Sequence, residues 1–154
     1  MSEARIRLGV SSDDEQVARL CEALWPESSW QEHREEIRPI LLGKPIATLP
    51  LVIFVAETID GTLAGFLEVG LRSHADGCDT RHPVGFVEGW FVKESLRRRG
   101  LGAQLLAAAE NWARGQGCVE MASDTWIDSS LSQRVHEMLE FEVVDRCVHY
   151  RKAL

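Results

Sequence analysis

The stretch that decides the fold is Val84–Ala103, which reads VGFVEGWFVKESLRRRGLGA. Val84–Val92 predicts a long β-strand, and Gly100–Gln116 predicts a helix with one apolar face. The turn between them carries Arg97, Arg98 and Arg99. A helix N-terminus leaves unpaired N–H groups and a partial positive charge, glycines admit a close ligand, and arginines add charge-assisted contacts. The stretch therefore suits a phosphate-bearing ligand, although a solvated basic turn could have the same composition.

The rest of the chain predicts two helices and a β-hairpin before this stretch, and a strand, a helix and a last strand after it. This order, β-α-α-β-β-β-α-β-α-β, indicates an α+β fold with a central antiparallel meander. The expected bounds are Arg5–Val10 (strand), Ser12–Leu24 and Ser29–Leu42 (helices with Ser-x-x-Glu capping boxes), Leu51–Thr58 and Leu63–Arg72 (strands joined at Asp60-Gly61), Glu120–Asp124 (strand), Ser130–Leu139 (helix) and Val143–Arg151 (strand).

Composition narrows the class of protein. The 154 residues, 45% hydrophobic and 27% charged, indicate one globular domain spanning residues 1–154. The chain shows neither the apolar block of a signal peptide nor a stretch of membrane-spanning length, so we expect a cytoplasmic protein without a membrane partner. The four cysteines lie far apart, which predicts neither a metal site nor a disulfide framework. The net charge of −7 makes nucleic acid a poor partner and a cationic substrate a better one.

The turn matches a known cofactor-binding pattern. Arg97-x-x-Gly100-x-Gly102, placed after a strand that ends Phe91-Val92, resembles the acetyl-CoA pyrophosphate loop of GNAT acetyltransferases. It fits neither a Walker loop nor a Rossmann fingerprint. The resemblance implies a mixed, mostly antiparallel sheet of six to seven strands flanked by about four helices. It also implies acetyl-CoA as cosubstrate, with its pantetheine arm along Trp90, Phe91 and Val92, and its phosphates at Arg97, Arg98, Arg99, Gly100, Leu101, Gly102 and Ala103. Two positions depart from the family pattern, Glu94 and Leu96.

Within that family the chain most resembles the aminoglycoside 6′-N-acetyltransferases. The resemblance is carried, in order, by Leu24-Trp25-Pro26, Leu67-Glu68, Phe86-Val87-Glu88-Gly89, Ala122-Ser123-Asp124 and His136-Glu137-Met138-Leu139-Glu140-Phe141. It implies acetylation of the 6′-amine, a role in antibiotic resistance, and a homodimer. It also suggests that Trp25 packs on a sugar ring and that Asp79 contacts substrate, while His136 takes the place of a tyrosine that protonates the leaving thiolate. Glu140 stands where the family has glycine.

Three carboxylates at strand positions suit a substrate with several ammonium groups. Such an amine arrives protonated and needs an acid group to hold it and to help remove its proton. Glu88 lies in an apolar strand between Phe86 and Trp90, which the alternation places on its own face. Glu68 supports the same inference, as does Asp124 at a strand end. These residues leave two alternatives open: acetylation of another small amine, such as a polyamine or an amino acid derivative, and a non-catalytic acyl-CoA-binding module.

Overall fold

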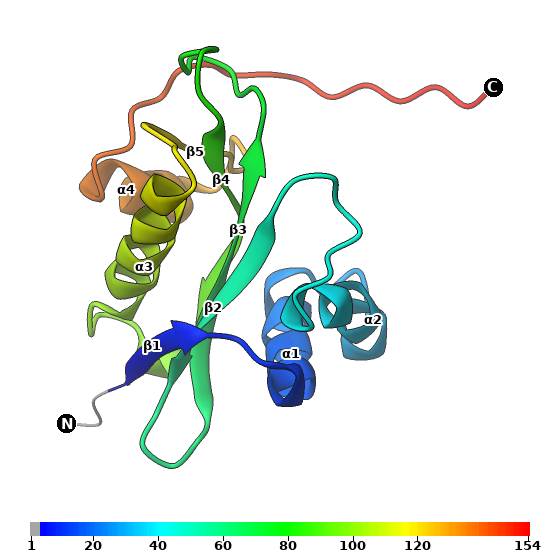
Figure 1. The fold of residues 1–154 in the computed structure, drawn as a ribbon, viewed down its shortest axis with the longest axis vertical. Helices are drawn as coiled ribbons and strands as arrows, with labels where there is room; N and C mark the ends of the chain where they lie inside the picture. The colour runs from blue at the N-terminus through cyan, green and yellow to red at the C-terminus, as the bar shows by residue number, and fades with distance from the viewer. Residues whose placement is uncertain (1–3) are drawn as a thin grey trace.

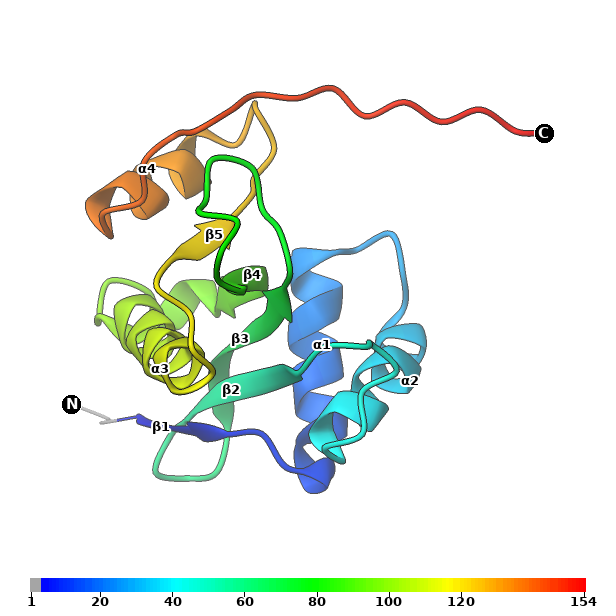
Figure 2. The ribbon, with the colours of Figure 1, turned by 45° about the horizontal axis from the view of Figure 1, so that its top comes forward.

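The computed structural model describes residues 4–154, which form one five-stranded sheet with helices on both faces (Figures 1 and 2). The strand order is β1-β2-β3-β4-β5. The first four strands pair antiparallel and β5 pairs parallel to β4, which confirms the mixed, mostly antiparallel α+β class. The elements are β1 (Arg5–Leu8), η1 (Ser11–Asp13), α1 (Asp14–Leu24), α2 (Trp30–Leu41), β2 (Leu51–Glu57), β3 (Leu63–Arg72), β4 (Val84–Val92), η2 (Glu94–Leu96), α3 (Leu101–Gly115), β5 (Met121–Ser123) and α4 (Ser130–Met138).

Two apolar clusters hold the layers together, one on each face of the sheet. Helices α1 and α2 pack on one face around Val17, Ile37 and Phe66. Helix α3 packs on the other face around Leu67 and Leu105. Successive β3 residues point to opposite faces because side chains alternate along a strand, so β3 is buried on both sides. This explains its nearly continuous apolar sequence.

The two predicted capping boxes had different outcomes. The box at Ser29 is confirmed: the Ser29 hydroxyl accepts a hydrogen bond from the Glu32 N–H (3.3 Å), and the Glu32 carboxylate accepts one from the Ser29 N–H (2.7 Å). The prediction of a capping box at Ser12 is wrong. Helix α1 begins at Asp14, and the Asp13 carboxylate accepts hydrogen bonds from the Val10 N–H and from Arg7. A buried ion pair there takes the place of the expected cap.

The expected sixth strand, Val143–Arg151, is the main difference from the predicted fold. In the structure this segment is extended but belongs to no strand of the sheet, and it leaves the body of the molecule (Figure 1). Within residues 4–154 the sheet therefore has five strands, not six to seven. Alternation of apolar and polar residues gives a segment the tendency to form a strand, but it does not supply the neighbour with which its backbone must pair.

The turn after α4 explains the unusual residue at position 140. Glu140 has φ = 69°, in the left-handed region where glycine carries no steric penalty. The family glycine at this position therefore has a conformational reason, and Glu140 adopts the same backbone shape at a cost. The four cysteines are free. Within the described part of the chain, no helix has the length and apolarity needed to cross a membrane.

Candidate active site

A β-bulge lies in β4 just past the last residue that pairs with β5, and a gap in the pairing of the two strands begins there. Glu68 of β3 lies opposite Gly89 and Val69 lies opposite Val87, so Glu88 is an extra residue in β4. Bulges bend the strand that carries them and increase its local twist. In residues 4–154, pairing with β5 covers only Gly85–Val87, whereas β4 continues beside β3 to Val92. The last part of β4 is thus left with an edge that β5 does not cover, where an extended ligand can hydrogen-bond to the backbone.

The turn after β4 places the N-terminus of α3 next to this unpaired part of β4. Gly100 has φ = 75° and begins a 15-residue helix that has no side-chain cap at its N-terminus. The N–H groups of the first turn therefore remain available for an anion. A Cβ atom on Gly102 would lie 3.6 Å from the Trp90 ring, which is ordinary contact. Packing within the protein thus tolerates a side chain at position 102, and the glycine keeps the helix start open.

The arginines of the turn have different positions. All three are exposed. The Arg97 Nε–H donates to the Val92 carbonyl oxygen (2.8 Å), and its guanidinium lies 5.4 Å from the centroid of the Phe91 ring. Arg98 has φ = 62°, which bends the chain into the helix start. The turn therefore combines positive charge with exposed backbone donors at the end of the open strand.

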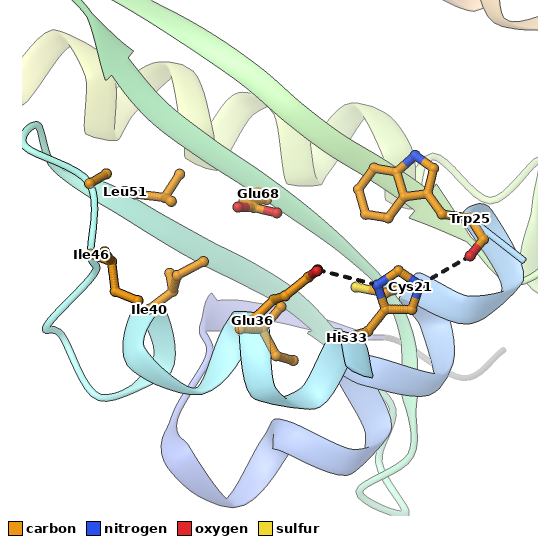
Figure 3. Close-up of a pocket in the computed structure, with 10 residues that line it drawn as sticks. Cys21, Trp25, His33, Glu36, Ile40, Ile46, Leu51 and Glu68 are labelled. Carbon is orange, nitrogen blue, oxygen red and sulfur yellow. Dashed lines mark hydrogen bonds and ion pairs between the residues drawn. The ribbon is translucent and has the colours of Figure 1, made fainter. Parts of the chain in front are cut away.

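A cavity of about 260 Å³ lies between helices α1 and α2 and the sheet (Figure 3). Trp25, at the end of α1, and Glu68, on β3, both line it. The Trp25 ring also lies against β4: a Cβ atom on Gly89 would be only 2.4 Å from Trp25 Cη2. Glycine at position 89 is therefore needed to seat the indole. Gly89 directly follows the bulge, so the Trp25 ring lies both in the cavity lining and next to the point where the pairing of β4 with β5 ends.

The cavity is acidic. It is lined by Glu36 as well as Glu68, among apolar side chains such as Ile40 and Leu51 (Figure 3). Burial, together with the nearby charges of Glu88 and Glu36, raises the pKa of Glu68 to about 7. Carboxylates from α2, β3 and β4 thus act on one another here. A cation entering the cavity would relieve their repulsion and offset the desolvation of Glu68.

The bulge corrects one expectation about Glu88. Phe86 packs with Val84 in a small cluster, whereas Trp90 packs with the α3 side of the sheet, so Phe86 and Trp90 do not share one face. The extra residue shifts the alternation by one position. Glu88 itself is held by Arg72, whose Nη2–H groups donate to both carboxylate oxygens at 3.0 Å. Glu88 is therefore an ion-paired carboxylate at the bulge, next to Glu68.

Like Glu88, the remaining two predicted substrate contacts, Asp79 and Asp124, do not line the cavity. Asp79 sits in the loop between β3 and β4, where its carboxylate pairs with Arg81 (2.6 Å) and its N–H donates to the Glu120 side chain. Asp124 directly follows β5 and is exposed. The structure thus brings Trp25, Glu68 and Glu88 together and places Asp124 at the end of β5, whereas Asp79 is paired with Arg81 and contacts Glu120.

His136 of α4 lies between Trp90 of β4 and Ser123 of β5 and is tightly held. Its Nδ1–H donates to the Ser132 carbonyl oxygen (2.7 Å), because a carbonyl can only accept. In the neutral ring, Nε2 then accepts the hydroxyl proton of Ser123 (2.8 Å). The imidazole also meets Trp90 edge-on, with 5.7 Å between ring centroids, and contacts Phe141 on the other side. His136 is thus part of the wall near the end of β5, and not a solvated surface residue.

The family model described as "Acetyltransferase (GNAT) family" matches residues 17–141. The chain belongs to this family. A curated GNAT relative, aminoglycoside N(6')-acetyltransferase type 1 of Klebsiella aerogenes, is 42% identical over 134 residues, which cover 87% of this chain and 86% of the relative. The match includes the bulged strand, the arginine-glycine turn and His136, so the family assignment covers the features described above.

Two solved GNAT structures agree with the whole fold. AAC(6')-Iy in complex with the bisubstrate analogue CoA-S-monomethyl-acetylneamine has a TM-score of 0.87 and 38% identity, covering 99% of this chain and 100% of that one. AAC(6')-Iy in complex with CoA has a TM-score of 0.89 and 37% identity, covering 100% of this chain and 97% of that one. These similarities agree with the expected subfamily.

Three site residues could not have been found from the sequence pattern alone. Glu36 looks like a polar position in an amphipathic helix, Arg72 ends a strand far from Glu88 in sequence, and Ser123 is one of many serines. Each acts through a contact with another element. Glu36 shares the cavity with Glu68, Arg72 forms an ion pair with Glu88, and Ser123 forms a hydrogen bond with His136. Because β3 and β4 are adjacent antiparallel strands, a charged pair across them could have been expected, and this would have indicated Arg72.

Proposed function

We propose that this chain transfers the acetyl group of acetyl-CoA to the 6′-amine of aminoglycosides, by direct attack of the amine on the thioester. One observation carries the proposal: an open strand edge beside an uncapped helix start meets, at Gly89, a cavity lined by the carboxylates of Glu36 and Glu68. The first feature suits a CoA thioester and the second suits a polycationic sugar. The similarity to aminoglycoside acetyltransferases over most of the chain supports the same assignment.

The cofactor is proposed to lie along the uncovered edge of β4. The backbone of Trp90, Phe91 and Val92 would pair with the amide groups of the pantetheine arm. The diphosphate would accept hydrogen bonds from the first turn of α3, where Leu101, Gly102 and Ala103 present their N–H groups, and the arginines of the turn would add positive charge. A backbone N–H near the bulge, for which Val92 is one candidate, would polarise the thioester carbonyl.

The acceptor is proposed to bind in the acidic cavity. A sugar ring would pack on the Trp25 indole, and the ammonium groups would meet Glu68, Glu88 and Glu36. Asp124 and Asp79 would serve further amines at the rim. Since an amine attacks only as the free base, a carboxylate must take up its proton, and Glu88 or Asp124 is proposed for this step. Arg72 would hold Glu88 in place while the substrate cation approaches.

The leaving thiolate needs a proton, and the Ser123–His136 pair is proposed to supply it. A neutral His136 has no proton on Nε2, because its Nδ1–H is engaged with the Ser132 carbonyl. Once the ring carries a second proton, Nε2–H points at the Ser123 oxygen, and the pair can pass one proton to the sulfur as the C–S bond breaks. The imidazolium then returns to the neutral form seen in this hydrogen-bond pattern.

We also propose that the protein works in the cytoplasm as a homodimer, since acetyl-CoA is a cytoplasmic metabolite and the chain leaves large apolar side chains exposed. Ile127, Leu131 and Met138, in and before α4, are 71%, 59% and 81% exposed. Apolar surface gathered in one region is typical of an interaction site.

The proposal is tested by following release of CoA thiol with acetyl-CoA and a panel of amines. The panel includes kanamycin-type sugars, spermidine and peptide amines, and mass spectrometry identifies the acetylated position. We expect the sugars with a free 6′-amine to be the best substrates and to be acetylated there. A higher kcat/KM with spermidine would instead favour a polyamine acetyltransferase, and binding of acetyl-CoA without any thiol release would indicate a non-catalytic module.

A further inference from the structure

His33 of α2 is a buried histidine in the lining of the cavity, and only one of its ring nitrogens has a hydrogen-bond partner. The residue is 5% exposed. Its Nε2 lies 3.0 Å from the Trp25 carbonyl oxygen, and since a carbonyl can only accept, Nε2 carries the proton. In the neutral ring, Nδ1 is then a bare acceptor. Within residues 4–154, Nδ1 forms no hydrogen bond and lies 3.6 Å from a carboxylate oxygen of Glu36 (Figure 3).

These two acceptors are placed so that one donor group can serve both. Two lone-pair atoms do not attract each other, and 3.6 Å is too long for a hydrogen bond. An ammonium group beside them can donate one N–H to Nδ1 and another to the carboxylate of Glu36, whose negative charge it also balances. A proton on Nδ1 would instead form an ion pair with Glu36, and an ammonium group takes the place of that proton.

The nearby arginines of α2 do not supply this cation. Arg34 and Arg38 both direct their Nε atoms to Asp14 of α1, at 2.7 and 3.2 Å. Among residues 4–154, Glu36 forms no ion pair with a lysine or an arginine. The side chain of Glu36 is 71% exposed, whereas that of His33 is 7% exposed, so the pair is open to solvent on the Glu36 side. A cation that fits between them therefore comes from a ligand.

We propose that His33 Nδ1 and the Glu36 carboxylate together bind one ammonium group of the acceptor, and that this group is not the amine that is acetylated. Trp25 contacts both sides of the cavity: its ring centroid is 6.0 Å from that of His33, and its Cη2 atom meets Gly89 of β4. The bound ammonium lies on the α2 side of the indole, and the reacting amine lies on the β4 side. The inference rests on the proposed function, because it assigns a second amine of the aminoglycoside to a place in the cavity.

This assignment makes His33 a specificity-determining residue. Acceptors that carry a second amine at the right distance from the 6′-amine gain a charge-assisted contact to a carboxylate and a hydrogen bond to a buried ring nitrogen. Acceptors with a hydroxyl group there lose the charge. His33 also fixes the Trp25 carbonyl, so a test must separate recognition of the ammonium from support of Trp25.

His33→Gln separates the two roles. The glutamine amide N–H can take the place of Nε2–H and keep the hydrogen bond to the Trp25 carbonyl, but it puts no acceptor at the position of Nδ1. His74→Gln is the matched control, because Nε2 of His74 also lies 3.6 Å from a carboxylate, that of Asp76, but this pair is exposed and lies outside the cavity lining. Circular dichroism confirms that each variant is folded.

Calorimetry then measures binding of kanamycin-type sugars, including a series in which each member lacks one amine. We expect His33→Gln to weaken binding of the full sugar about tenfold, with a matching rise in KM and little change in kcat. His74→Gln should change neither. For the one sugar that lacks the amine held by the pair, the loss caused by His33→Gln should disappear. The double variant with Glu36→Gln should lose less than the product of the two single losses, because both groups hold the same ammonium.

A second measurement needs no variant that alters the site. In the wild type, nitrogen NMR of labelled histidine should show the Nδ1 resonance of His33 moving when the full sugar is added, while its Nε2 resonance stays in place. An unmoved Nδ1 resonance with bound sugar would overturn the proposal. A loss in His33→Gln that is equal for every sugar of the series would do the same, since the ring would then only support Trp25.

Failure of this inference can be told from failure of the proposed function. A wild type that releases CoA thiol with these sugars, and that His33→Gln matches in affinity, would remove the subsite and leave acetyl transfer standing. A wild type that binds none of the sugars would overturn both.

Discussion

Replacing Glu68 with glutamine is expected to stabilise the fold at alkaline pH and to weaken binding of the acceptor. Burial, with the charges of Glu88 and Glu36, raises the pKa of Glu68 from 4.5 to about 7. The folded chain therefore holds this proton more tightly than the unfolded chain does. Glu68 therefore favours the folded state at low pH, and this contribution is lost as the pH rises through the pKa that Glu68 has in the folded chain.

The size of the effect follows from the two pKa values. Their difference corresponds to about 3 kcal/mol at about 1.36 kcal/mol per pH unit. Glu68 is only partly buried, so we expect about 2 kcal/mol after allowing for solvent screening. At about pH 8 both states are ionised and the folded state carries this whole cost. At about pH 5 the folded carboxyl keeps its proton, and the cost falls below about 1 kcal/mol.

Urea unfolding of the wild type and Glu68→Gln at both pH values measures this difference. We expect the variant to gain about 2 kcal/mol in unfolding free energy near pH 8 and much less near pH 5. Glu35→Gln, an exposed position on α2, is the control and should change little at either pH. A gain that is equal at the two pH values, or a loss near pH 8, would show that Glu68 is not destabilised by burial and repulsion.

The same substitution should have the opposite effect on function. A charge-assisted contact to an ammonium group contributes about 1.5–3 kcal/mol, so the KM for the aminoglycoside should rise by roughly tenfold or more. In the wild type, the KM should fall as the pH rises through about 7, because ionised Glu68 attracts the cation. A KM unaffected by Glu68→Gln would remove this residue from the acceptor site.

Three further changes test other parts of the site. Gly102→Asp places a carboxylate at the helix start, where there is space beside Trp90, and should weaken acetyl-CoA binding about tenfold or more by calorimetry; unchanged affinity would exclude this turn as the phosphate site. His136→Ala should lower kcat about a hundredfold, most strongly at low pH where the doubly protonated ring can supply a proton, whereas the exposed His74→Ala should not; identical pH profiles would assign His136 a packing role alone. Glu140→Gly should raise the unfolding free energy by about 1 kcal/mol in urea, since it relieves a positive φ, and a loss of stability would show that the side chain compensates for the strain.

Much of the architecture could be predicted because it depends on local patterns. The hairpin around Gly61, the capping box at Ser29 and helix α3 each follow from residues close in sequence. The bulge at Glu88 could not be predicted from the alternation, since an extra residue becomes visible only when the strand is paired. That one residue placed Trp90 on the α3 side, away from Phe86.

The sequence by itself determined the family, the arginine-glycine turn at the start of α3, and the presence of carboxylates within the β-strands. These features rest on residue type and short spacing. Only the tertiary structure decided which carboxylates share a cavity, that Arg72 pairs with Glu88, and that Ser123 joins His136. The physical reason is that pKa, ion pairing and proton transfer depend on distances across a few ångströms of space, which the order of residues along the chain does not specify.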